Sequence, residues 1–161
     1  MKSRRASGAL LVALTVALDQ SIKAWVVAAM PLHSSIEVLP YLALFHTRNE
    51  GVAFSFLTGI GTTLLLVITA AVAVFIAWLW RSNPPQRVFA HLGFAMIVGG
   101  AIGNLIDRAL RGNVVDYVYF HTPVWSFAVF NLADAAITIG AGLVLLDEFL
   151  DWRSSRRAAD G

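Results

Sequence analysis

Two aspartates, Asp116 and Asp134, stand in surroundings that are almost free of other charges. Asp116 lies in the apolar run 114–118, and Asp134 is followed by twelve uncharged residues, 135–146. Neighbouring carboxylates cannot both ionise easily, so the pKa of one of them is raised. One ionised base beside one neutral acid is the arrangement of an aspartic protease. If the fold brings these aspartates together, the two residues predict hydrolysis by acid–base catalysis.

Each aspartate also has a purely structural interpretation. Asp116 could be a surface acid on an edge strand. Asn131 is a favoured helix N-cap, and an acid three residues later suits the positive end of a helix. An acid at the mouth of a membrane helix is costly unless it is paired or protonated. For Asp134 we therefore favour a functional role over a cap alone.

Further polar residues interrupt apolar segments. Asp19 and Lys23 are four residues apart, so on a helix they share a face and can pair. They fit equally well a neutralised pair near the outer end of a helix or part of a functional site. The same spacing recurs twice at the end of a later apolar segment, in Asn104 with Arg108 and in Asp107 with Arg111. These pairs are either a polar helix end or side chains of the same site.

Several other chemistries are disfavoured. The absence of cysteine removes disulfides, thiolate zinc sites and a thiol nucleophile. The four histidines lack metal-ligand spacing, and Ser21 and Lys23 point to different sides of a helix, which argues against a Ser–Lys peptidase. There is no glycine-rich phosphate loop and no basic, aromatic stripe for nucleic acid. We therefore expect no metal, no cofactor and no nucleic-acid partner.

The composition places these residues in a membrane protein. Apolar residues make up 58% of the 161 positions and charged residues only 14%, against roughly 25% charged in soluble domains. Four apolar segments approach the ~20 residues with which a helix crosses a bilayer. The sequence predicts a single domain, 1–161, of the all-α membrane class. Its four transmembrane helices are expected at roughly 8–30, 59–80, 88–108 and 127–150.

Basic residues predict the orientation of these helices. Eight of the twelve Lys and Arg residues lie at the two termini and in the 81–87 loop, so both termini should face the cytoplasm. The segments 31–58 and 109–126 then face outward, where we expect a small β-rich extracytoplasmic module. Its strands are predicted where β-branched and aromatic residues gather: 36–39, 41–47, 52–57 and 114–120.

The first and third apolar segments each allow a further interpretation. The first segment could be a cleavable signal peptide, because a basic start precedes the apolar core 9–18. Asp19 and Lys23 would then separate that core from a weak cleavage site. In the third segment Ala95, Gly99 and Gly103 form a stripe of small residues, which predicts close packing on a neighbouring helix.

Five short motifs stand in a fixed order along nearly the whole chain. They read LDQSIK at 18–23, NEGVAFSF at 49–56, GGAIGNLIDR at 99–108, GNVVDY at 112–117 and FNLADAAI at 130–137. In this order, on a four-helix chain of this size, they resemble lipoprotein signal peptidase, the type II signal peptidase of bacteria.

The resemblance implies a function and a set of site residues. Family members cleave the signal peptide from diacylglyceryl-modified prolipoproteins just before the lipidated cysteine, without a metal, and the resemblance makes Asp116 and Asp134 the catalytic pair. The positions implied to bind substrate or brace the site are Asp19, Lys23, Asn49, Gly51, Gly100, Asn104, Arg108 and Asn131. The expected partners are lipidated prolipoproteins and membrane lipids. The chain is expected to be a monomer in the bacterial inner membrane, with its site near the extracytoplasmic face.

Two other classes of protein stay open at this stage. A small proton-coupled transporter would use Asp19, Lys23 and Asp134 to relay charge, but it predicts acids spread through the membrane depth rather than gathered at one side. A membrane adaptor would use the polar residues for packing alone. Conversion of a lipidated prolipoprotein to its mature size distinguishes the peptidase from both.

Overall fold

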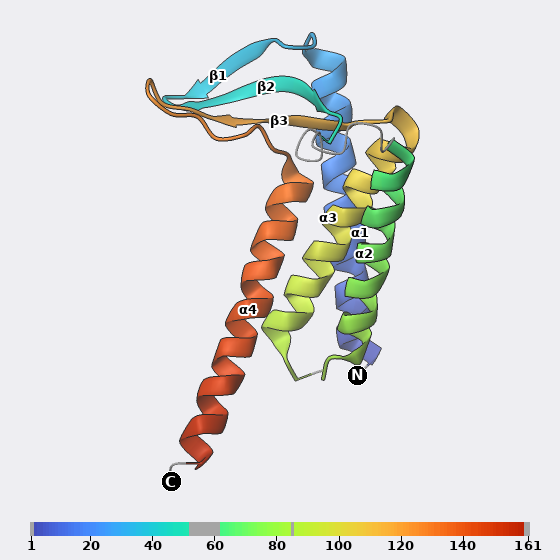
Figure 1. Cartoon of the computed structure of the whole chain (residues 1–161), viewed down its shortest axis with the longest axis vertical. Helices are drawn as coiled ribbons and strands as arrows, with labels where there is room; N and C mark the ends of the chain where they lie inside the picture. The colour runs from blue at the N-terminus through green and yellow to red at the C-terminus, as the bar shows by residue number, and fades with distance from the viewer. Residues whose placement is uncertain (1, 52–61, 85, 160–161) are drawn as a thin grey trace.

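The computed structural model describes residues 2–51, 62–84 and 86–159. Four helices form a bundle that carries a small sheet across one end, and both chain termini lie at the opposite end (Figure 1). In chain order the elements are α1 Lys2–Ala29, β1 Ser35–Leu39, β2 Leu42–Asn49, α2 Thr62–Ser82, α3 Val88–Arg111, β3 Val114–Phe120 and α4 Leu132–Ala159.

Three of the helices contain segments long and apolar enough to cross a membrane, namely Ala6–Ala29, Thr63–Ser82 and Val88–Arg111. This confirms a mostly helical protein of the membrane class. The fourth predicted helix is also present as α4. It carries Asp134 in its first turn and Asp147 and Glu148 further along, and this density of acids sets it apart from the other three helices.

Helix α3 is the centre of the bundle, because it packs against α1, α2 and α4. The predicted stripe of small residues faces α1: a side chain on Gly99 would approach the Cβ of Thr15 to 2.8 Å. On the face toward α4, a side chain at Gly100 would collide with the carbonyl oxygen of Ala133. Gly100 therefore acts through its lack of a side chain, which lets α3 and α4 approach closely.

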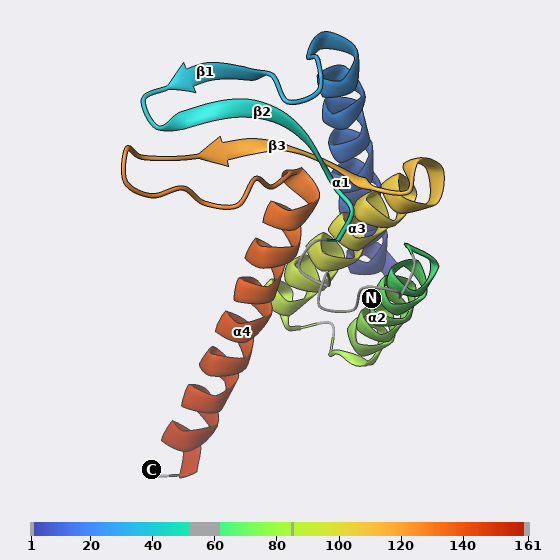
Figure 2. The same ribbon diagram turned by 45° about the horizontal axis from the view of Figure 1, so that its top comes forward.

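The sheet is antiparallel with the strand order β1-β2-β3, and Figure 2 shows it curving over the end of the bundle. Strand β1 is exposed along its whole length, whereas the first four residues of β3 are buried. Val115 and Tyr117 of β3 form an apolar cluster with Val26 of α1 and with Met30, which directly follows that helix. This cluster fixes β3 against the bundle. The strands predicted at 36–39, 41–47 and 114–120 are thus confirmed, and the one predicted at 52–57 lies outside the described residues.

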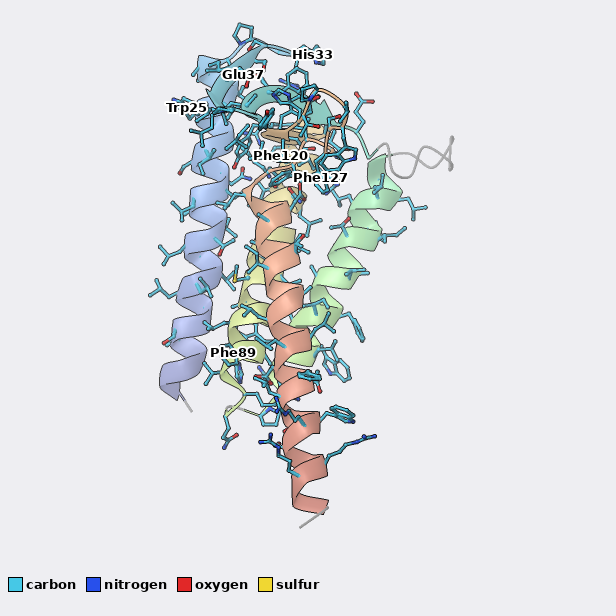
Figure 3. All side chains as sticks on the ribbon, turned by 90° about the vertical axis from the view of Figure 1, so that its left-hand side faces the viewer. Trp25, His33, Glu37, Phe89, Phe120 and Phe127 are labelled. Atoms are coloured by element: carbon cyan, nitrogen blue, oxygen red, sulfur yellow. The ribbon has the colours of Figure 1, made fainter. Side chains whose placement is uncertain are left out.

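The predicted boundaries of the fourth helix were wrong. Helix α4 begins at Leu132, not at 127, and continues to Ala159, beyond 150. The residues before it pair with β3 instead: the Phe127 N–H donates to the Phe120 carbonyl, and the Phe130 N–H donates to that of Val118. Residues 127–130 therefore run back along β3 like a strand. The backbone N–H groups of Phe127 and Phe130 are bonded to β3 and are not free to form a helix. Figure 3 shows Phe120 and Phe127 together at the sheet end of the bundle, with Phe89 at the other end.

Two further helix ends also differ from expectation. Helix α1 begins at Lys2 rather than 8, and α3 continues to Arg111 rather than 108. At the end of α3 the backbone of Gly112 is left-handed, and its N–H donates to the Arg108 carbonyl, which is a common way for a helix to end.

Candidate active site

Asp116 is held at the buried start of β3 by two asparagine side chains. The Asn131 Nδ2 donates to its Oδ1 at 2.6 Å, and the Asn49 Nδ2 donates to its Oδ2 at 3.1 Å. Its side chain is only 2% exposed. Burial raises the pKa of Asp116 to about 6, and the negative charge of Asp134 adds to the rise. Both asparagines are neutral donors, so they orient this carboxyl without supplying a positive charge.

Asp134 lies in the first turn of α4, where it takes part in a reciprocal helix cap with Asn131. The Asp134 N–H donates to Asn131 Oδ1 at 3.0 Å, and the Asn131 N–H donates to Asp134 Oδ2 at 3.3 Å. This is the N-cap that the sequence allowed. The other carboxylate oxygen, Oδ1, accepts a hydrogen bond from Asn104 Nδ2 at 2.8 Å. Asp134 therefore belongs both to the cap and to a polar network that reaches α3.

Asn131 brings the two aspartates into one site. Its side chain bonds to Asp116 and to the backbone of Asp134, and its Nδ2 also lies 3.3 Å from Asn104 Oδ1. The fold thus joins a strand, β3, and the start of a helix, α4, through a single amide. The role of Asn131 as a bridge could not be inferred from its position as a helix cap.

A buried cluster of charges lies behind these asparagines. Lys23 Nζ forms ion pairs with Asp19 Oδ2 at 2.9 Å and with Asp107 Oδ2 at 3.1 Å, and all three side chains are fully buried. Lys23 also donates to Asn104 Oδ1 at 2.9 Å. Because its oxygen is taken by Lys23, Asn104 turns its Nδ2 toward Asp134. The predicted Asp19–Lys23 pair exists and is connected to the site through Asn104.

The same cluster ties distant elements to one another. Asp19 Oδ1 accepts the backbone N–H of Ala133 in α4, and Asp107 Oδ2 accepts that of Val115 in β3, both at 3.1 Å. Asp107 also pairs with Arg111, as its spacing predicted. Helix α1 therefore holds the start of α4 directly and reaches β3 through Asp107 of α3.

Two residues of the network were not singled out by the sequence. Gln20 Nε2 donates to the Gly103 carbonyl at 3.0 Å and to Asp19 Oδ2 at 3.1 Å. The hydroxyl of Tyr117 accepts the N–H of Leu132 at 3.1 Å, at the start of α4, and burial raises its pKa to about 12. Gln20 adjoins Asp19 in the first polar cluster, but no spacing rule marked either residue.

The remaining predicted positions divide between the network and its edge. Gly51 has a positive φ of 92°, and its N–H donates to Asn49 Oδ1 at 2.8 Å, so this turn orients the Asn49 side chain. The side chain of Arg108 is half-buried and forms no hydrogen bond or ion pair with any residue that the structure describes. Within the described ranges there is also no group of three His, Asp or Glu side chains that could hold a metal ion.

These features define a helical membrane protein whose polar core holds two aspartates in one hydrogen-bonded network. A model of the family "Signal peptidase (SPase) II" matches residues 11–150. The chain belongs to this family of aspartic peptidases.

Relatives and solved structures agree with this family over most of the chain. The lipoprotein signal peptidases of Brucella ovis and Brucella melitensis are each 57% identical over 150 residues, which cover 93% of this chain and 94% of theirs. A bacterial membrane enzyme solved by the in meso method at 2.3 Å resolution is 29% identical. It superposes with a TM-score of 0.81 over 91% of this chain and 89% of that chain.

Proposed function

We propose that the chain removes signal peptides from diacylglyceryl-modified prolipoproteins by cleaving just before the lipidated cysteine. Membership of the signal peptidase II family supports this activity. The observation that carries the proposal is that one side chain, Asn131, bonds to both aspartates. Its Nδ2 donates to Asp116, and its Oδ1 accepts the backbone N–H of Asp134. A peptidase of this type needs two carboxyl groups of different protonation close together, and this bridge provides the pairing.

Asp134 acts as the base and Asp116 holds the proton that the pair shares. Asp134 lies at the start of α4, where it accepts hydrogen bonds from the Asn131 N–H and from Asn104 Nδ2, so its carboxyl is held as an acceptor. Asp116 is more deeply buried, and its pKa is raised to about 6. A substrate that covers the site excludes water and favours the neutral form of Asp116 further.

The bond is broken by addition of water to the scissile carbonyl. Asp134 takes a proton from the water as its oxygen attacks the carbonyl carbon, and Asp116 hydrogen-bonds and protonates the carbonyl oxygen. The tetrahedral intermediate then collapses: Asp116 takes back the proton of the hydroxyl that becomes the new carbonyl, the C–N bond breaks, and the proton on Asp134 passes to the leaving amine. Acid–base assistance of this kind contributes roughly 10²–10⁴-fold, and positioning of the substrate contributes to the remainder.

The supporting residues have distinct roles. Asn49, Asn104 and Asn131 orient the carboxyl groups, while Asp19 and Lys23 fix Asn104 and the start of α4. Gly51 shapes the turn that carries Asn49, and Gly100 allows the approach of α4. Arg108, whose guanidinium has no partner among the described side chains, is available to hydrogen-bond backbone carbonyls of the substrate.

The enzyme crosses the inner membrane four times, with both termini in the cytoplasm and the site near the extracytoplasmic face. Helix α4 provides the fourth span through its uncharged stretch 135–146, and it packs along α3. The placement of both termini at the end opposite the sheet supports this topology (Figure 1). The positive-inside rule gives the same direction. A lipidated substrate would then reach the site by lateral diffusion, and the enzyme works as a monomer.

Cleavage of a lipidated prolipoprotein by purified protein tests the proposal. Asp116→Asn and Asp134→Asn should each lower the rate on the order of 10³-fold, because each removes one partner of the acid–base pair. Asp151→Asn, the same change at an exposed position of α4, is the matched control and should keep full activity. Cooperative thermal unfolding shows that the variants are folded. Normal cleavage by either folded site variant would disprove the assignment.

A further inference from the structure

A groove lies at the end of the bundle opposite the aspartates, between α1, α2 and α3. Its volume is about 500 Å³, within the range of about 300–1,000 Å³ that holds ligand-sized molecules. Its walls are mainly apolar. They include Ala9 of α1, Ala77, Trp78 and Trp80 of α2, and His91 of α3. It is remote from the proposed peptidase site, and nothing in that mechanism uses it.

The indole of Trp80 forms a fixed wall of this groove. Its Nε1 donates to His91 Nδ1 at 2.7 Å. Because an indole N–H can only donate, neutral His91 carries its hydrogen on Nε2, which donates to the Pro84 carbonyl at 3.1 Å. A side chain at Gly8 would collide with the Trp80 ring, so α1 packs directly on it. The polar atoms of this wall are therefore already satisfied.

Arg81 supplies a free positive charge to the same groove. It lies in the last turn of α2, is exposed, and forms no ion pair or hydrogen bond with any residue in the described part of the chain. Arg87, a few residues later, is engaged by Asp147 at 2.6 Å and by Glu148 at 2.9 Å. The residues that line the groove include no acid, so the charge of Arg81 is not neutralised from within it.

We propose that this groove binds an anionic glycerophospholipid. An acyl chain lies between Ala9 and Ala77, and the phosphate pairs with Arg81. The apolar walls and single guanidinium match an amphiphile with one apolar and one anionic end, and a guanidinium binds phosphate through paired N–H donors. A zwitterionic lipid would also bring a cation, for which the groove offers no carboxylate. Tryptophans at the rim suit the headgroup level.

The membrane position agrees with this ligand. In the proposed topology the groove opens toward the cytoplasmic leaflet, where anionic lipids and basic segments attract each other. The inference does not rest on the peptidase activity, so a failure of one leaves the other standing.

Lipid binding to delipidated, purified protein tests the proposal. Dioleoylphosphatidylglycerol or dioleoylphosphatidylcholine is added to the parent, to Arg81→Gln and to Arg153→Gln, an exposed control arginine on α4. Native mass spectrometry gives the affinity, and thermal unfolding gives the stabilisation. We expect phosphatidylglycerol to bind and stabilise the parent, Arg81→Gln to weaken its binding about fivefold, and Arg153→Gln to leave it unchanged.

A second variant tests the groove without a change of charge. Ala9→Phe should fill the groove and weaken binding of phosphatidylglycerol while prolipoprotein cleavage continues at the parent rate. Equal affinity of the parent and Arg81→Gln for phosphatidylglycerol would overturn the proposal. So would phosphatidylcholine binding as tight as that of phosphatidylglycerol, or full binding to Ala9→Phe.

Discussion

Two pairs of aspartates share one polar core, and their charges are balanced in opposite ways. Asp19 and Asp107 have a buried cation between them, because Lys23 Nζ lies within 3.1 Å of a carboxylate oxygen of each. Asp116 and Asp134 are held by the neutral amides of Asn49, Asn104 and Asn131. The first pair therefore has a cation in direct contact inside a buried site. The second pair has only neutral donors in direct contact.

The two pairs therefore have different tasks: the first holds the fold together, and the second carries out the proposed chemistry. Buried carboxylates with a cation serve as fixed anchors, here for the backbone of Ala133 and Val115. Buried carboxylates with neutral donors keep a titratable proton, which acid–base catalysis requires. Asn104 connects the two pairs, since its oxygen faces Lys23 and its amide faces Asp134. Variants can therefore be directed at either pair.

The largest effect on stability is expected from Lys23→Met. It leaves the buried Asp19 carboxylate without a cation and Asp107 with Arg111 alone. The removal of one member of a buried ion pair costs about 3–5 kcal/mol. Chemical denaturation in detergent measures the loss. The double variant Lys23→Met with Asp19→Asn should recover part of it, because one uncompensated charge is removed. A parent-like stability of Lys23→Met would contradict the anchoring role of this cluster.

A smaller effect, of opposite sign, is expected from Asp116→Asn. The pKa of Asp116 rises from 3.8 in the unfolded chain to about 6 in the fold, so the folded form binds more protons between these values. The parent therefore loses stability as pH rises from about 4 to 6, by up to about 3 kcal/mol. Asp116→Asn lacks this loss. Its unfolding temperature relative to the parent should rise across this window and then stay level.

The matched control for that comparison is Asp151→Asn, which removes an exposed carboxyl. Its unfolding temperature should follow that of the parent at every pH. A difference between Asp116→Asn and the parent that does not vary with pH would show that Asp116 titrates alike in the folded and unfolded chain.

A shift in the pH dependence of cleavage is expected from Asn49→Ala. In the free enzyme kcat/KM should fall as pH rises through about 6, where the shared proton on Asp116 is lost. The Asn49 hydrogen bond favours the ionised form of Asp116, so its removal should move this limb to higher pH. Kinetics over pH 4–9 measure the shift, about one pH unit or less. A shift of this limb to lower pH would contradict the assignment of the titrating group to Asp116.

The smallest effect is expected from Arg111→Gln. Arg111 pairs with Asp107, but its side chain is 27% exposed, and Lys23 already lies beside that carboxylate. Ion pairs near the surface contribute about 0–1 kcal/mol. Denaturation should therefore show a change within this range and cleavage should be unaffected. A loss as large as that of Lys23→Met would mean that both cations are needed to hold the cluster.

Elements whose composition is uniform along their length were predictable. Helix α2 was readable from its uninterrupted apolar run, and the strands β2 and β3 from their β-branched and aromatic residues. The start of α4 was marked only by the capping preference of Asn131, because residues 127–130 are apolar in either conformation. Only their backbone hydrogen bonds to β3 decide between strand and helix. An apolar sequence indicates that a segment is buried in the membrane or the protein. It does not indicate which backbone groups that segment will bond to.

The site residues were predictable in type, and the connections between them were not. Isolated acids in apolar segments marked Asp116 and Asp134, and helical spacing marked Asp19 with Lys23. The path from Lys23 through Asn104 to Asp134 joins three helices, and no local pattern encodes it. Tyr117 was hidden in the same way, because its partner is the backbone of a helix start distant in sequence.

The shared use of Asn131 has a consequence for the newly made chain. The amide that caps α4 is also the amide that holds Asp116, so the aspartate pair is completed only when the start of the last helix meets β3. A copy whose last helix has not yet joined the bundle lacks this pair. Synthesis of this protein would then yield no active protease until assembly in the membrane is complete.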